Sequence, residues 1–398
     1  GLFYSTQPAA LAGRPIVRMK HVLVVVALGT AIAAKVRLQP ASESLPPFYH
    51  TSEELREELQ HLVSTCPELT LKTHWAPNAS FGRSVQLDVI SIKAKDAGAK
   101  KLNKVFMLFG EHARELISAE SGLHFAKTLC GERKEAILRG NEFMMVINAN
   151  PESRSRVEKG EWCLRVNPNG VDLNRNWDEH WEGDASFGKD TNPGETPFSE
   201  PETQLLKQLV SAYRPTTFFT IHSGTLGMYM PWAFDMQHLA DRNQQSMMEI
   251  LKKVDEDHCQ CPFGAAGKEV GYSCPGTCLD WVFDQLKTPY CFAYEIYYGG
   301  SLSQLRDRWQ DKLQWPGASL LQEQNLAHEH FKDLFAHFLS SFIQVASQAE
   351  QALQELNELQ GFACFKMFNP DTEEKYRETI ENWSNAYLDT VAEVTSRL

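Results

Sequence analysis

The stretch "VFMLFGEHARELIS", residues 105–118, decides the fold that we expect for this chain. Residues 105–109 form a nearly continuous apolar run, which is typical of a strand buried on both faces. Gly110 ends this run, and apolar residues then recur with helical spacing at Leu116, Ala119, Leu123 and Ala126. The loop between this strand and this helix carries His112 and Glu115. In α/β folds, functional groups gather in such loops at the carboxyl ends of the strands.

Other parts of the chain repeat this alternation of strand and helix. Strand-like segments are "SVQLDVISI" (84–92), "KVFMLFG" (104–110), "EFMMVINAN" (142–150), "TTFFTIH" (216–222) and "PYCFAYEIY" (289–297). Helical patterns lie between them, for example at residues 118–129 and 200–213, and a helix capped by Thr51 or Ser52 precedes them. The sequence therefore predicts an α/β fold with a mixed, largely parallel central sheet flanked by helices.

The chain divides into five segments by composition. Residues 1–18 precede the first methionine, and we expect them to lie upstream of the natural start. Residues 19–34 have the basic start, apolar run and small-residue end of a signal peptide, although a buried strand or helix is the alternative. A short linker (35–47), one domain (48–300) and a helical C-terminal extension packed on that domain (301–398) follow. The extension could instead lie on a lipid surface, but its polar face is not especially basic.

The composition excludes some classes of protein. The chain has 398 residues, 42% of them hydrophobic, which suffices for a large core. A net charge of -12 argues against a nucleic-acid partner, and the lack of a long uninterrupted apolar stretch argues against stable membrane association. Of the nine cysteines, five lie between residues 259 and 291. In a secreted protein, one or two disulfides are expected in that stretch.

Two strand ends suggest a metal site. His112 and Glu115 follow one strand, and "FFTIHSG" ends another strand with His222. A single H-x-x-E is weak, because a structural histidine would explain it equally well. Two histidines and one carboxylate, however, leave a fourth tetrahedral position open, which is the form of a catalytic zinc site. We therefore expect one Zn²⁺ per chain.

Two further motifs add chemistry to this site. In "YCFAYEIYYGG", Glu295 lies near the end of an apolar strand, where an unpaired carboxylate would be costly unless it is an edge-strand surface residue. Beside zinc, such a carboxylate suits a general base. In "GVDLNRNWD", Asn174 and Arg175 lie in a loop. Arginine can bind a carboxylate through two parallel hydrogen bonds, although taken singly it is an ordinary ion-pairing residue.

Taken together, the motifs resemble the zinc metallocarboxypeptidases of the carboxypeptidase A/B type. The matching motifs are H-x-x-E (112–115), "NPNGVDLNRNWD" (167–178), "PFSEPET" (197–203), "IHS" (221–223) and Glu295, in the order found in that family. The resemblance covers about residues 48–300, which it identifies as a zinc carboxypeptidase catalytic domain. The tail "CFKMFNP" (364–370) looks like that of secreted plant and algal members.

The resemblance implies a role for each matching residue. It makes His112, Glu115 and His222 the zinc ligands and Glu295 the general base that later protonates the leaving amine. It further implies that Arg165 stabilises the oxyanion and that Asn174 and Arg175 hold the terminal carboxylate. Tyr272 would close over the substrate and Arg114 would line the substrate groove. Leu279 would lie at the base of the pocket. Leucine there favours apolar or aromatic C-terminal residues, although Asp235 could still select basic ones.

We therefore expect a secreted zinc carboxypeptidase, in the extracellular space or the endomembrane lumen. Its partners would be the C-termini of peptides or proteins, and we expect a monomer. Two other functions stay open. One is another zinc amide hydrolase on the same scaffold, acting on cell-wall peptides or acyl-amino acids. The other is a catalytically silent module that binds peptide tails.

Overall fold

The computed structural model of the chain describes five stretches. They are residues 44–78, 83–94, 102–183, 188–300 and 362–398. The upstream segment (1–18), the expected signal peptide (19–34) and most of the C-terminal extension (301–361) lie outside the described residues.

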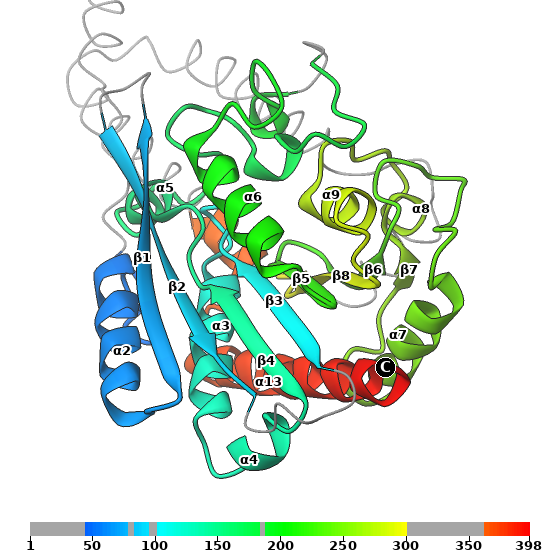
Figure 1. Cartoon of the computed structure of the whole chain (residues 1–398). Helices are drawn as coiled ribbons and strands as arrows, with labels where there is room; N and C mark the ends of the chain where they lie inside the picture. Colours follow the sequence, from blue (N-terminus) through cyan, green and yellow to red (C-terminus); the bar gives the residue numbers. More distant parts are fainter. Residues whose placement is uncertain (1–43, 79–82, 95–101, 184–187, 301–361) are drawn as a thin grey trace, which may run out of the picture.

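Within the described residues, a mixed eight-stranded sheet forms the centre, in the order β1-β2-β4-β3-β5-β8-β6-β7 (Figure 1). The strands are β1 (Leu69–Asn78), β2 (Arg83–Ile92), β3 (Asn103–Phe109), β4 (Asn141–Val146), β5 (Thr217–His222), β6 (Leu226–Met230), β7 (Phe263–Ala265) and β8 (Tyr290–Ile296). Strands β4, β3, β5 and β8 are mutually parallel, whereas β2 runs antiparallel to β1 and β4, and β6 runs antiparallel to β8. The predicted α/β class with a largely parallel centre is confirmed.

All five strands predicted from the sequence are present, but β1, β6 and β7 were not predicted. Strand β1 lies at the edge of the sheet and mixes polar with apolar residues. Strand β6 contains Gly227, and β7 spans only three residues. By sequence alone, a strand this short or this mixed in polarity cannot be distinguished from a loop.

Helices cover both faces of the sheet. They are α2 (Ser52–Thr65), α3 (Leu116–Leu129), α4 (Lys134–Ile137), α5 (Pro151–Val157), α6 (Pro201–Tyr213), α7 (Gln244–His258), α8 (Ala266–Val270), α9 (Cys278–Gln285) and α13 (Glu373–Arg397). In Figure 1, α6 lies in front of the sheet, and α3 and α13 lie behind it. Phe106 of β3 contacts Tyr213 of α6, whereas Phe109 of β3 contacts Tyr387 of α13. Because alternate strand residues point to opposite faces, β3 is covered on both, which explains its continuous apolar run.

Helix α2 begins as the sequence predicts. The side chain of Thr51 accepts a hydrogen bond from the Glu54 backbone N–H, and the Glu54 carboxylate accepts one from the Thr51 backbone N–H. Thr51 is thus the capping residue of a reciprocal capping box, and Ser52 is the first helical residue.

The described C-terminal segment belongs to the same core. Helix α13 packs against α3 and α7 and touches β3 and β8. Before it, the Asn369 side chain accepts a hydrogen bond from the Ile117 N–H at 3.0 Å and donates one to the Arg114 carbonyl at 2.9 Å. The tail therefore holds the loop that carries Arg114. None of the helices in the described residues is long and apolar enough to cross a membrane.

Three disulfides occur among the described cysteines. They join Cys66 to Cys130, Cys163 to Cys364 and Cys259 to Cys261. Only the last lies in the cysteine-rich stretch where we expected bridges, and the three other cysteines of that stretch are free and buried. The remaining two bridges connect segments that are distant in sequence, so spacing gave no sign of them.

Candidate active site

The functional residues converge because three parallel strands end side by side. Strand β5 lies between β3 and β8, and its register pairs Ile221 with Phe109 and His222 with Glu295. After β3 the chain turns at Gly110, which has a φ of +69° and would bring a Cβ atom within 3.2 Å of the Asn148 backbone. Glycine suits both demands. The loop that carries His112 and Glu115 thus lies at the carboxyl edge of the sheet.

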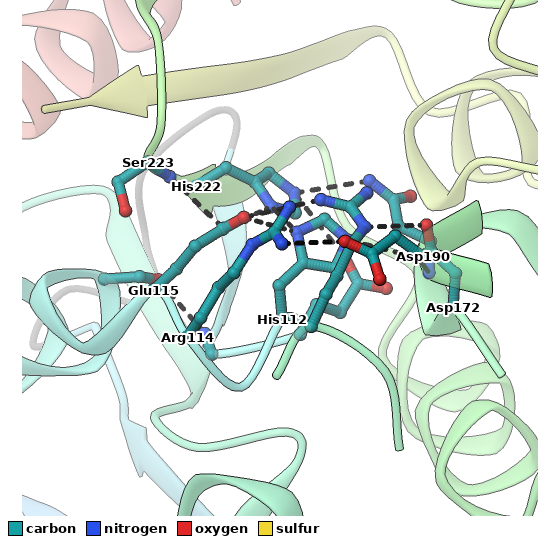
Figure 2. Close-up of polar contacts among 12 residues, drawn as sticks. His112, Arg114, Glu115, Asp172, Asp190, His222 and Ser223 are labelled. Carbon is teal, nitrogen blue, oxygen red and sulfur yellow. Dashed lines mark hydrogen bonds and ion pairs between the residues drawn. The ribbon is translucent and has the colours of Figure 1, made fainter. Parts of the chain in front are cut away.

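His112, Glu115 and His222 form one buried cluster (Figure 2). Glu115 Oε1 lies 2.8 Å from His112 Nδ1, and Glu115 Oε2 lies 3.1 Å from His222 Nδ1. The two Nδ1 atoms are 3.1 Å apart. Burial acts to raise the pKa of Glu115, but the two histidines together bring it well below its usual range. The cluster therefore presents an ionised carboxylate oxygen and two imidazole nitrogens at one point.

Each histidine of the cluster is held at its other nitrogen. His112 Nε2 lies 3.1 Å from Asp172 Oδ1, and His222 Nε2 lies 2.7 Å from Thr220 Oγ1. Such partners leave Nδ1 of each ring for a metal ion and fix the direction of the ring. Two neutral imidazoles and one carboxylate are a donor set that zinc prefers. The residues therefore fit a single zinc ion, as the sequence predicts.

Asp172 is a member of the site that the sequence analysis missed. Its carboxylate is fully buried and accepts hydrogen bonds from Arg165 Nε at 2.9 Å and from the Asn174 N–H at 2.9 Å. Burial acts to raise the pKa of Asp172, but Arg165 and His112 hold it well below its usual range. The only sequence signal was an acid two positions before Asn174.

The predicted arginines differ in their ion-pair partners. Arg165 pairs with Asp172 and also lies 3.6 Å from Oε1 of the ligand Glu115. Arg114 pairs with Asp190 at 2.9 Å and stacks on the Phe368 ring at 4.2 Å. No sequence pattern indicated the contact between Arg114 and Asp190.

Arg175 is the exception among these arginines. Its side chain is buried, with the residue 6% exposed, and its Nη1 donates to the Asn174 carbonyl at 2.7 Å. No carboxylate of the described residues forms an ion pair with Arg175. The neighbouring Asp172 is within electrostatic range, but its oxygens are already bound by Arg165, His112 and the backbone.

Asn174 connects the metal cluster to helix α9. Its Nδ2 lies 3.4 Å from His222 Nε2, and its Oδ1 accepts from the Cys278 N–H at 3.0 Å. Leu279, the predicted pocket residue, follows Cys278 and is buried in α9. The structure thus brings Leu279 onto an element that contacts the site.

Glu295 and Tyr272 complete the set of predicted residues. Burial and the nearby charge of Glu115 raise the pKa of Glu295 to about 8, against smaller opposite effects of His222 and Arg165. Its Oε2 is buried and has no hydrogen-bond partner within the described part of the chain. Tyr272 is half-buried, and burial raises the pKa of its hydroxyl, which lies in the field of Arg175 and Arg165.

Known proteins with sequence similarity to this chain are carboxypeptidases by name. Carboxypeptidase A1 of Sus scrofa is 25% identical over 277 residues, which cover 62% of each chain. Carboxypeptidase A2 of Mus musculus is 23% identical over 283 residues, covering 63% of this chain and 64% of that protein. The chain thus spans less than two thirds of the length of these relatives.

Solved structures show the same fold. Bovine thrombin-activatable fibrinolysis inhibitor, in complex with tick carboxypeptidase inhibitor, superposes with a TM-score of 0.63 at 17% identity, covering 88% of this chain and 98% of that one. Carboxypeptidase A from Helicoverpa armigera gives a TM-score of 0.54 at 21% identity, covering 70% and 71%. The sequence model described as zinc carboxypeptidase matches residues 55–315, which is well over half of the chain. With its buried histidine–glutamate–histidine cluster, this chain belongs to the zinc carboxypeptidase family.

Proposed function

We propose that this protein is a secreted zinc carboxypeptidase that hydrolyses the C-terminal peptide bond of peptides or proteins. The observation that carries the proposal is Arg175, a buried guanidinium that has no ion-pair partner among the described carboxylates. A buried charge without a partner is costly. The terminal carboxylate of a substrate would satisfy it through two parallel hydrogen bonds, with Asn174 beside it.

His112, Glu115 and His222 would hold the zinc ion. When bound, zinc supplies Lewis acidity toward the scissile carbonyl group and toward a water molecule. Asp172 keeps His112 in place through Nε2. Arg165 lies against Glu115 and has further N–H groups that can donate to the carbonyl oxygen as negative charge develops on it.

Glu295 is the proton carrier in this proposal. Its Oε2 atom is buried without a hydrogen-bond partner in the described residues, and burial raises its pKa, so the ionised carboxylate is a stronger base than that of an ordinary glutamate. It would take a proton from the attacking water and return it to the leaving amine. Tyr272 would close over the substrate near Arg175, and Arg114 would line the groove.

We propose a preference for apolar or aromatic C-terminal residues. Leu279 is buried on α9, and Ala293, which lies two residues before Glu295 on β8, adds no charge there. Asp235, the alternative selector for basic residues, is engaged within its own loop. Its carboxylate accepts from the Gln237 N–H at 2.7 Å and pairs with His238.

Secretion is supported by the disulfides. Cys66–Cys130 and Cys163–Cys364 join distant segments, and such bridges persist in oxidising compartments. We further propose that residues 19–34 are the signal peptide, that 48–300 form the catalytic domain and that 301–398 pack on it. A monomer and an affinity to plant and algal members stay predictions.

The test is hydrolysis of a peptide panel with varied last residues, each as free acid and as amide, with and without a zinc chelator. Chelator-sensitive release of only the last residue is expected. Because the proposed site pairs the buried Arg175 with the terminal carboxylate of the substrate, amidated peptides should react roughly 10⁴-fold more slowly than free acids. Apolar and aromatic last residues should be released fastest.

The alternatives give different outcomes in the same panel. Equal cleavage of acids and amides would contradict the role of Arg175 and favour another zinc amide hydrolase. No cleavage by protein that holds zinc would favour a binding module.

A further inference from the structure

Glu111 is a buried carboxylate that the proposed reaction does not use. It directly precedes the ligand His112 and is 1% exposed. Its Oε2 accepts hydrogen bonds from Thr220 Oγ1 at 3.1 Å and from Cys278 Sγ at 3.4 Å. Its Oε1 is buried without a partner among the described residues. Burying a carboxylate so incompletely satisfied is costly, so its place beside the metal cluster calls for a role.

Thr220 links Glu111 to the metal cluster. It lies two residues before His222 on β5, so both side chains point to the same face of the sheet. Its Oγ1 is 3.1 Å from Glu111 Oε2 and 2.7 Å from His222 Nε2. The three side chains form a continuous chain of hydrogen bonds that ends on a zinc ligand.

The chemistry of these groups fixes the direction of both hydrogen bonds. The Thr220 hydroxyl donates its hydrogen to Glu111 Oε2, because a carboxylate oxygen accepts. A lone pair of Thr220 then faces His222, and His222 Nε2 must donate to it. A neutral imidazole carries one N–H, so Nδ1 of His222 keeps its lone pair and turns it toward His112 and Glu115.

The other neighbour of His222 Nε2 does not reverse this order. Asn174 Nδ2 lies farther away, at 3.4 Å. The Asn174 amide is oriented by its Oδ1, which accepts from the Cys278 N–H at 3.0 Å, so its nitrogen faces the ring and offers no lone pair. An amide donor there would favour a lone pair on Nε2, but its contact at 3.4 Å is the weaker one. The 2.7 Å contact decides, and Thr220 is the acceptor for His222 Nε2.

We infer that Glu111 and Thr220 form a positioning relay that fixes the tautomer and the direction of His222 for zinc. His112 is held by Asp172 directly, whereas His222 is held by Glu111 through a hydroxyl group. The inference rests on the zinc site and not on peptide specificity. A test that reads zinc affinity therefore stays independent of whether the protein proves to be a carboxypeptidase.

The first experiment measures the zinc affinity of the metal-free protein by competition with a chelating dye. Thr220→Val, which removes the hydroxyl at nearly constant volume, should weaken zinc binding ~10–100-fold. Thr220→Ser keeps the hydroxyl and should restore most of the affinity. Thr217→Val is the matched control, because Thr217 is also buried on β5 but donates to Asn103 Oδ1, away from the site. It should leave zinc affinity unchanged even if it lowers stability.

The second experiment separates a relay from a simple charge effect. Glu111 Oε2 lies 3.6 Å from His222 Nε2, so its charge could act directly. If the relay is correct, Glu111→Gln weakens zinc binding about 10-fold in the natural background and far less when Thr220 is already valine. Equal losses in both backgrounds, or wild-type affinity in Thr220→Val, would overturn the inference. If the valine variant does not fold, Glu111→Gln and Thr220→Ser are compared with the natural protein. The relay predicts weaker zinc binding with glutamine and nearly natural affinity with serine, and natural affinity in Glu111→Gln would also refute it.

Discussion

Replacing Arg175 with methionine should separate substrate recognition from stability. In the free protein, this guanidinium donates to the Asn174 carbonyl but forms no ion pair with any carboxylate of the described residues. With substrate, it would gain two hydrogen bonds to the terminal carboxylate. Hydrogen bonds to charged groups contribute about 1.5–3 kcal/mol each, so the pair contributes about 3–6 kcal/mol. At about 1.4 kcal/mol per tenfold, Arg175→Met should lower kcat/KM on free-acid peptides by roughly 10²–10⁴-fold.

The same substitution should not destabilise the protein. Methionine removes a buried cation that lacks an ion-pair partner, and exchanging such a charge for an apolar side chain is often neutral or stabilising. Arg114→Met is the matched control, because Arg114 is also a largely buried arginine of the site but pairs with Asp190 and stacks on Phe368. Its loss should cost stability, while the preference for free acids over amides should largely remain.

Two measurements check this prediction. The ratio of kcat/KM between free-acid and amidated peptides should fall toward one in Arg175→Met and stay high in Arg114→Met. Urea unfolding should give Arg175→Met a free energy of unfolding equal to or above that of the natural protein. A variant that keeps the ratio, or that loses more than about 2 kcal/mol of stability, would refute the reasoning and make Arg175 a structural residue.

Three further predictions concern catalysis, pH and stability. Glu295→Gln should lower kcat by ~10²–10⁴-fold without changing the zinc content, because it removes the general base. Glu120 raises the pKa of His50 through a 2.7 Å contact, against the effect of burial. The contact therefore stabilises the folded protein at pH values below the pKa of His50 in the unfolded chain. This stabilisation is lost as the pH rises through the pKa of His50 in the folded protein. The stability difference between the natural protein and His50→Gln should therefore be larger near pH 5.5 than near pH 8.5, by about 1 kcal/mol. Replacing Cys163 and Cys364 by alanine removes a bridge between residues with a sequence separation of 201. The free energy of unfolding, measured with denaturant, should fall by about 5 kcal/mol.

A specific result would contradict each of these three predictions. Zinc loss in Glu295→Gln would make that residue part of the metal site. A stability difference that grows with pH would show that His50 is held in its neutral form. An unchanged unfolding midpoint without Cys163–Cys364 would mean that the C-terminal segment is already restrained in the unfolded chain.

The sequence by itself determined the central strands and the metal ligands. Strands β3, β5 and β8 are buried on both faces, so their apolar runs stand out without any knowledge of their neighbours. The ligands follow from those runs, because His112, Glu115 and His222 come at or just after the strand ends. Hydrophobic periodicity and the order of motifs can be read from a single sequence, because neither depends on how distant segments pack.

The tertiary structure alone decided which groups support those ligands. Asp172 holds His112 across 60 residues, and Asn369 reaches Ile117 across 252. The pairing of Cys163 with Cys364 and of Arg114 with Asp190 likewise depends on the path of the chain. No local pattern encodes such a contact, because it forms only when the packing of the sheet and helices brings the two segments together. For the same reason, only the structure shows that Arg114 has an ion-pair partner while Arg175 has none among the described residues.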